Sequence, residues 1–242
     1  HGSRKPLRTM STRIPPLLEP YLALPSEASL VLLTNVLGAS SNWLVLRFLY
    51  SVLAQQDKGS GEDQGQNKVL LISFLRDFSF WKEGSRRLGV DLDRLHTQGK
   101  FAFVDGLSGL FQPQGRSGLR GAGKATVLQS TDLSALTKAI TTTIQQLKGR
   151  EPQGKVLLVI DQLDLLLAAG GEAIKPGDLG DLLLTLREQV HATVLTMAAD
   201  EPLVAAQQTP LETDHAAFLL GTAHQADYMM SLRLLDTGTA RD

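Results

Sequence analysis

The stretch that determines the fold of this chain covers residues 30–53 and reads LVLLTNVLGASSNWLVLRFLYSVL. Its first five residues form a continuous apolar run, which predicts a strand buried on both faces of a sheet. Residues 35–41 indicate a turn. Residues 42–53 are too apolar for an exposed helix, so we expect that helix to pack on the sheet. A buried strand, a turn and a packed helix make up the repeating unit of a parallel α/β sheet.

The same alternation continues along the chain. Further buried strands are expected at residues 68–74, 101–104, 156–160 and 192–197, and helices at residues 78–88, 131–147 and 178–190. A short turn is expected at 92–95 and a short helical piece after Glu201-Pro202. Ser130 or Thr131 can cap the second of these helices. A last strand at residues 229–235 alternates in polarity, which favours an antiparallel edge strand. The chain is therefore predicted to be an α/β protein with a mostly parallel central sheet and helices on both faces.

Composition separates a short N-terminal segment from the rest of the chain. Residues 1–28 contain five prolines, which predicts an extension lying over the surface, and His1-Gly2-Ser3 resembles a cloning scar. Residues 29–242 are expected to form a single domain, because the alternation of strands and helices runs through them without a break. Residues 55–67 hold three glycines among mostly polar neighbours and indicate a mobile loop. Because the chain ends soon after the last strand, we expect a truncated C-terminus that lacks a hairpin partner.

Charge and composition limit the binding partners of the 242-residue chain. The net charge is −1, so no global field attracts nucleic acid, and any RNA contact must come from a local basic patch. Cysteine is absent, which excludes disulfides, thiolate zinc sites and cysteine nucleophiles. No apolar run reaches the roughly 18–20 residues needed to cross a bilayer. We expect no metal site, because metal-ligand spacing is not found among His96, His191, His215 and His224.

The first strand and turn occupy the place of a phosphate-binding loop. Such a loop needs the pattern G-x-x-x-x-G-K-[ST], in which backbone amides surround the phosphates and the lysine neutralises them. Gly38 and Ser40 match that pattern, whereas Leu33 replaces the first glycine and Ala39 replaces the lysine. Because the main cation facing the phosphates is missing, we expect a degenerate nucleotide site and an ordinary turn. Weak residual nucleotide contact is the alternative.

A second match to the phosphate-loop pattern lies at residues 118–125, which read GLRGAGKA. This match follows a polar loop, and residues 126–128 do not resemble the opening of a helix. A phosphate loop works because the amides of a helix N-terminus point at the phosphate. We therefore interpret this match as accidental.

The same loop offers a candidate RNA contact. Arg116, Arg120 and Lys124 lie in it with no acidic residue among them. These cations are candidates for contact with an RNA backbone, and a solvated loop without that role is the alternative.

Asp161 ends an apolar run that starts at Val156. An apolar strand followed by aspartate is the form of a Walker B motif, whose carboxylate organises Mg²⁺ in active nucleotide hydrolases. Any buried strand that ends in aspartate has this form. Without a phosphate-binding loop, we interpret Asp161 as a capping or turn residue, and we assign no catalytic residue.

The region of the second strand resembles RecA-type ATPases related to the circadian-clock and archaeal recombinase proteins. The resemblance rests on Ser73-Phe74-Leu75-Arg76, on residues 84–92 and on Gly99-Lys100-Phe101. In active members of that group, two acidic residues follow the Ser/Thr-Phe pair, and one of them activates the attacking water. Leu75 and Arg76 stand at these positions here. The resemblance therefore implies that the catalytic acid is missing as well as the lysine.

Residues 81–89 and 103–111, together with the turn at 38–40 and the strand that ends at Asp161, resemble the subunit 6 family of the Elongator complex over about residues 20–235. The resemblance implies a RecA-like P-loop NTPase fold and a non-catalytic role without a cofactor. It implies a hexameric ring with Elongator subunits 4 and 5, docked on the larger Elongator subunits. It also implies tRNA binding by the ring, a role in modification of the wobble uridine (U34), and a place in the cytoplasm and the nucleus.

Two other interpretations remain open at this stage. The chain can be a RecA-family ATPase whose site is completed by a neighbouring subunit or by the loop at residues 118–125. It can also be a scaffold that makes no contact with RNA.

Overall fold

The computed structural model describes residues 16–54, 67–111, 125–149, 154–205 and 207–234. These residues contain seven strands: β1 (Leu30–Asn35), β2 (Lys68–Ser73), β3 (Phe101–Asp105), β4 (Ala125–Val127), β5 (Val156–Asp161), β6 (Ala192–Ala198) and β7 (Tyr228–Ser231). The strands form one sheet in the order β4-β3-β2-β5-β6-β1-β7, and neighbouring strands pair in parallel throughout. The α/β class and the RecA-like arrangement expected from the sequence are confirmed.

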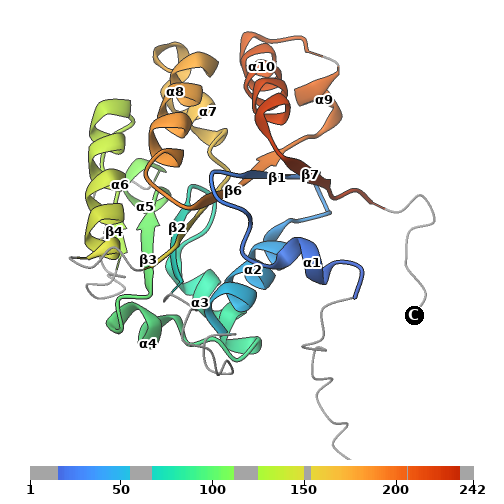
Figure 1. Cartoon of the computed structure of the whole chain (residues 1–242). Coiled ribbons are helices and arrows are strands. Elements are labelled where there is room, and N and C mark those ends of the chain that lie inside the picture. Colours follow the sequence, from blue (N-terminus) through green and yellow to red (C-terminus); the bar gives the residue numbers. More distant parts are fainter. Residues whose placement is uncertain (1–15, 55–66, 112–124, 150–153, 206, 235–242) are drawn as a thin grey trace, which may run out of the picture.

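Helices cover both faces of the sheet (Figure 1). On one face lie α1 (Glu19–Leu22), α2 (Asn42–Ala54), α3 (Phe78–Arg87) and α4 (Leu92–Thr97). On the other face lie α6 (Leu133–Lys148), α7 (Leu165–Gly170), α8 (Pro176–Arg187) and α10 (Pro210–Gln225). Three short helices connect these elements: α5 (Ser108–Phe111), the 3-10 helix η2 (Gly171–Ala173) and α9 (Glu201–Val204). None of the helices in the described ranges has both the length and the apolar character needed to span a membrane.

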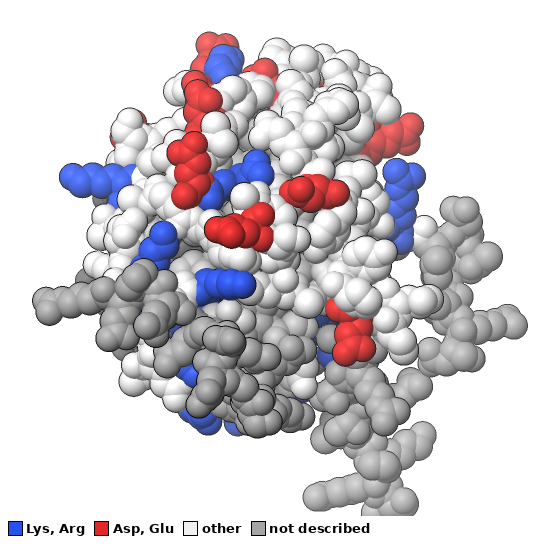
Figure 2. All heavy atoms as spheres, viewed as in Figure 1, with Lys and Arg blue, Asp and Glu red and all other residues white. Residues whose placement is uncertain are grey.

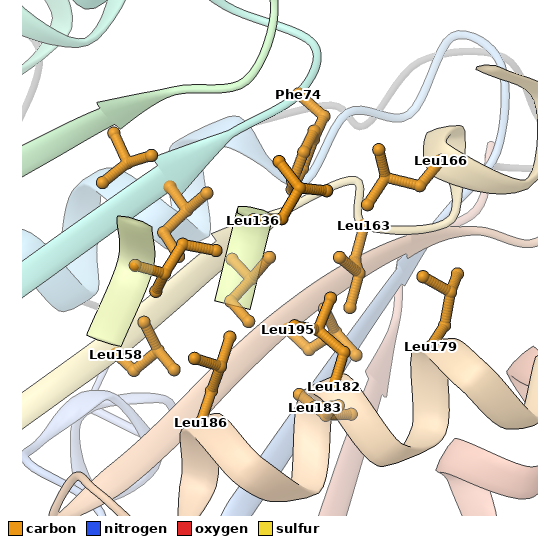
Figure 3. Packing of buried hydrophobic residues seen from close by; sticks show 14 of the residues in the cluster. Phe74, Leu136, Leu158, Leu163, Leu166, Leu179, Leu182, Leu183, Leu186 and Leu195 are labelled. Carbon is orange, nitrogen blue, oxygen red and sulfur yellow. The ribbon is translucent and has the colours of Figure 1, made fainter. Parts of the chain in front are cut away.

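Each central strand contributes to two cores, because successive side chains of a strand point to opposite faces. In β1, Leu30 and Leu32 pack in the core beneath α6, α8 and α10, whereas Val31 and Leu33 pack in the core beneath α2 and α3. Figure 3 shows the first core, in which leucines of α8 lie against strand residues such as Leu195. The uninterrupted apolar strands of the sequence are therefore explained by a sheet that is buried on both sides.

The N-terminal cap of α6 differs from the sequence expectation. Asp132 caps the helix, and its Oδ2 accepts a hydrogen bond of 2.8 Å from the backbone N–H of Ala135. Ser130 instead accepts a hydrogen bond from the backbone N–H of Asp132, at 3.0 Å. The assignment of the cap to Ser130 or Thr131 was wrong, because the helix begins at Leu133 and the carboxylate directly before it reaches the free amide.

The C-terminal strand was expected to be an antiparallel edge strand. It does lie at the edge of the sheet, but β7 pairs with β1 in parallel. The cause is α10, which carries the chain back along the sheet before β7 begins and which we did not predict. Its sequence hides it because its buried face carries the polar residues His215 and Thr222 while Leu211 and Leu220 are exposed, so the apolar residues do not form a single stripe.

The N-terminal segment also differs in part from the expectation. Residues 19–22 form α1, and Leu22 is fully buried in the core beneath α2, so an extended course over the surface is wrong for these residues. The boundary between residues 1–28 and 29–242 stays a prediction. The loop expected at 55–67 lies, except for Asn67, outside the described residues.

Candidate functional site

The turn after β1 closes on itself. The backbone N–H of Ala39 donates a 2.9 Å hydrogen bond to the carbonyl oxygen of Val36, and these two residues form a short antiparallel bridge. Gly38 has a φ of +90°, which side chains with a Cβ rarely adopt. Because α2 begins only at Asn42, Gly38, Ala39 and Ser40 precede the helix, whereas the lysine and hydroxyl of a phosphate loop stand at its N-terminus.

The polar groups of this turn bind other groups of the same chain. The backbone N–H of Leu37 donates a 2.8 Å hydrogen bond to Oδ1 of Asp200, the residue before α9. Ser40 Oγ accepts a hydrogen bond from the N–H of Asn42, at 3.2 Å. The chain's own carboxylate thus binds an amide of the turn, and its negative charge opposes the binding of an anion beside it.

Asp161, the Walker B-like residue, is fully buried at the end of β5 and joins three adjacent strands. Its Oδ2 accepts a 2.7 Å hydrogen bond from Ser73 Oγ of β2, and its Oδ1 accepts a 2.9 Å hydrogen bond from Thr196 Oγ1 of β6. The interpretation of Asp161 as a capping or turn residue is therefore wrong. Its carboxylate uses hydroxyl groups of neighbouring strands as partners.

Burial has a marked effect on the acidity of Asp161. It raises the pKa of this carboxyl group from 3.8 to about 6, against the opposing effect of the hydrogen bonds from Ser73 and Thr196. The nearby charge of Asp164 raises the pKa of Asp161 further, and that of Arg76 lowers it. The end of β5 is thus an enclosed polar centre with two acidic groups.

The resemblance to RecA-type ATPases places Arg76 at a position expected to be acidic in active members of that group. Its backbone N–H donates a 2.9 Å hydrogen bond to Ser73 Oγ, and its guanidinium carbon lies 5.1 Å from the centre of the Phe80 ring. A cation over an aromatic face is attracted by the ring. Because the guanidinium of Arg76 is already protonated and positively charged, it cannot accept a proton from water as a general base does.

A buried pair that the sequence did not indicate lies beside this centre. His215 Nε2 of α10 is 3.1 Å from Oδ2 of Asp164, and both side chains are buried. In the sequence His215 was notable only for its lack of metal-ligand spacing, and the structure gives it an acidic partner 51 residues away. Within the described ranges, no group of three or more histidine, aspartate or glutamate side chains could hold a metal ion.

The motif at residues 103–111 is explained by close packing after β3. Asp105 accepts hydrogen bonds from the N–H groups of Leu107 and Ser108, at 2.9 and 2.8 Å. A Cβ on Gly106 would lie 2.5 Å from the Phe74 ring. At Gly109, a Cβ would lie 2.0 Å from a backbone oxygen. Only glycine fits at either position, because such contacts are far shorter than van der Waals distance.

Arg116, Arg120 and Lys124 lie outside the described residues. Ala125 opens β4, so the second phosphate-loop match is followed by a strand where a phosphate loop requires a helix.

A search of curated proteins gave no significant match. A family model described as Elongation complex protein 6 matches residues 60–242. The matched segment covers well over half of the chain and includes the second strand, the motif at 103–111 and Asp161. The chain therefore belongs to the Elongation complex protein 6 family.

Proposed function

We propose that this chain is a non-catalytic structural subunit of the Elongator complex, which assembles with subunits 4 and 5 into a hexameric RecA-like ring. The observation that carries the proposal is the family match over residues 60–242. The geometry supports the absence of catalysis. Ala39 stands in the lysine position, Arg76 in an acid position, and Asp200 binds the turn amide. The proposed role requires no cofactor.

The assembled ring binds tRNA, docks on the larger Elongator subunits and supports modification of the wobble uridine, in the cytoplasm and the nucleus. A near-neutral chain is a weak RNA binder by itself, but basic loops from several subunits of a ring add their contacts. Arg116, Arg120 and Lys124 are the cations proposed for this contact.

Co-expression with Elongator subunits 4 and 5, followed by mass measurement of the purified product, tests the assembly. We expect one hexameric species with two copies of each subunit. If the 26.2 kDa chain remained a monomer beside its intended partners, the ring would be refuted.

Charge reversal tests the RNA contact. Changing Arg116, Arg120 and Lys124 together to glutamate should weaken tRNA binding by the assembled ring and reduce its dependence on salt, because fewer counterions are released. Unchanged affinity and an unchanged salt slope would refute the role of this loop and favour a scaffold without RNA contact.

Calorimetry with Mg-ATP separates the proposal from an ATPase whose site is completed in trans. We expect no binding of Mg-ATP by the isolated chain. Tight binding that Lys124→Ala abolishes would favour the ATPase instead, with residues 118–125 as its phosphate loop.

A further inference from the structure

The last helix and strand of the described chain lie together at one edge of the sheet. α10 leads into β7, and within the described residues β1 is the only strand that pairs with β7. We propose that α10 and β7, here called the α10–β7 cover, open as one unit from the edge of β1 while the rest of the sheet stays folded. This conformational device goes beyond the proposed function and does not depend on it.

The edge of β1 beneath the cover is apolar. Residues 31–34 of β1 pair with residues 228–231 of β7, and Val31, Leu32 and Leu33 are fully buried. An unpaired strand edge with apolar side chains is a template for pairing with other chains. The closed cover therefore protects the sheet from association along β1, and its opening exposes that edge.

The cover buries little apolar surface compared with the central strands. The side chains of β7 alternate between partly buried and exposed. α10 buries two large apolar side chains, Phe218 and Leu219, beside the small Ala216. By contrast, every residue of β5 is buried. Segments with few buried apolar contacts open at a lower free energy than core strands do, so the cover should open before β5 is released.

A buried polar contact holds α10 without satisfying either partner completely. His215 Nε2 lies 3.1 Å from Oδ2 of Asp164, and both side chains are buried. Nδ1 of His215 and Oδ1 of Asp164 are also buried, and neither has a hydrogen-bond partner within the described residues. Opening gives both atoms access to water, which offsets part of the free energy lost with the contact. The contact therefore fixes the position of α10 but leaves the cover able to open.

The contacts between α10 and α8 are exposed. Lys175 Nζ lies 3.8 Å from Oδ2 of Asp214, and both side chains reach solvent. Arg187 Nη1 donates a 3.4 Å hydrogen bond to Oε1 of Gln225, which is exposed as well. Figure 2 shows mostly white, uncharged atoms at the place where Figure 1 labels α10. Because exposed polar contacts stabilise little, charge does not lock the cover in place.

Native-state hydrogen exchange of the full chain tests the opening. The backbone N–H groups of Asp227 and Leu232 donate hydrogen bonds to the carbonyl oxygens of Leu30 and Thr34 in β1. We expect their protection from exchange to be about a hundredfold weaker than that of amides in the middle of β5. Amides around Leu219 in α10 should share this weaker protection, because the cover opens as one unit. If the α10 amides were instead protected as strongly as those of β5, the inference would be overturned.

One substitution far from the cover separates its opening from global unfolding. Val104 is fully buried in β3, and β2, β5, β6 and β1 lie between that strand and β7. Val104→Ala should speed exchange in β5 about tenfold and leave exchange in the cover unchanged, because β3 stays folded when the cover opens. Equal acceleration in β5 and in the cover would overturn the inference, since the cover would then open only when the whole chain unfolds.

A substitution within the cover tests the buried contact. His215→Ala should speed exchange in α10 and β7 about tenfold, because it removes the partner of the buried Asp164 carboxylate. His224→Ala, at an exposed position of the same helix, is the matched control and should leave exchange in the cover unchanged. Equal effects of the two variants would show that the buried contact does not hold α10, which contradicts the inference.

A crosslink provides a test that does not depend on weakening the fold. Thr34 Oγ1 of β1 and Ser231 Oγ of β7 lie 2.8 Å apart, and the chain contains no cysteine. In the double variant Thr34→Cys, Ser231→Cys, oxidation should slow exchange in α10 and β7 about tenfold or more relative to the reduced form, because the cover can no longer leave β1. Identical exchange in the oxidised and reduced forms would overturn the inference.

Discussion

The turn after β1 and the end of β5 lie at the same edge of the sheet, and both occupy places where RecA-type enzymes handle nucleotides. The turn is exposed, has no cation at Ala39 and is held by a backbone contact to Asp200. The end of β5 is closed, and Asp161 keeps its carboxylate with hydroxyl partners on both neighbouring strands. The turn thus offers no cation at position 39, whereas the end of β5 holds a carboxylate that joins three strands.

The largest expected effect concerns Asp161 and pH. Because its folded-state pKa is raised, the folded protein binds this proton more tightly than the unfolded chain does. The stabilisation is complete below pH 3.8 and is lost as the pH rises through about 6, with a total loss of about 3 kcal/mol. The free energy of unfolding of Asp161→Asn, relative to the unaltered chain, should therefore rise by a similar amount between pH 4 and pH 8.

Denaturant unfolding at several pH values measures this difference, and the comparison between the two proteins removes the titration of other carboxylates. If the difference in unfolding free energy between the two proteins did not change with pH, the end of β5 would not be an enclosed carboxylate centre. It would then resemble the exposed turn.

A smaller effect is expected from one buried hydroxyl group. Thr196→Val removes the donor to Asp161 and the acceptor for the backbone N–H of Gln162, and should cost about 2 kcal/mol of unfolding free energy. Thr193→Val is the matched control on the same strand, because the buried Oγ1 of Thr193 has no hydrogen-bond partner. Equal losses in both variants would mean that volume, and not the Asp161 network, determines stability here.

The turn should respond more weakly and more locally. Asp200→Ala removes the partner of the Leu37 amide, and should cost about 1 kcal/mol or less because the bond is exposed. Hydrogen exchange at the Leu37 amide should become faster, while exchange in β5 stays the same. Glu201→Ala, which removes the next carboxylate along the chain, is the control. If the Leu37 amide remained protected from hydrogen exchange in Asp200→Ala, the turn would not depend on this contact. The contrast between the turn after β1 and the end of β5 would then be refuted.

The smallest effect is expected from restoring the lysine. Ala39→Lys should leave the chain without measurable Mg-ATP binding in calorimetry, because Asp200 still occupies the turn amide and α2 still begins at Asn42. Binding in the micromolar range would show that the missing cation alone had inactivated the turn.

Most of the elements were predictable because their causes are local. The apolar runs of β1, β2, β5 and β6 and the periodicity of α6 depend on residues close together in the sequence. α10 was missed because its buried face includes His215 and Thr222 while Leu220 is exposed, so polarity does not follow burial along the helix. The direction of β7 was missed because α10, which returns the chain along the sheet, was missed. The motif at 103–111 was visible as a pattern, but the need for Gly106 and Gly109 appears only when Phe74 and Leu128 lie against them.

The candidate site was only partly predictable. The absence of lysine at Ala39 and of acid at Leu75 and Arg76 can be seen in the sequence. The carboxyl ends of parallel strands meet at one edge, which was the available signal that polar residues after β5 and β6 would lie near the turn. This rule does not identify which atoms form hydrogen bonds with one another.

The sequence by itself therefore determined the alternation of strands and helices and the double burial of the sheet, because each depends on residue type and short-range spacing. Tertiary structure decided the partners: Asp161 with Ser73, Asp164 with His215, and Asp200 with Leu37, separated by 88, 51 and 163 residues. Such contacts form only when packed strands and helices bring distant residues within hydrogen-bond distance. The conformational preferences of neighbouring residues do not specify which distant atoms come within hydrogen-bond distance.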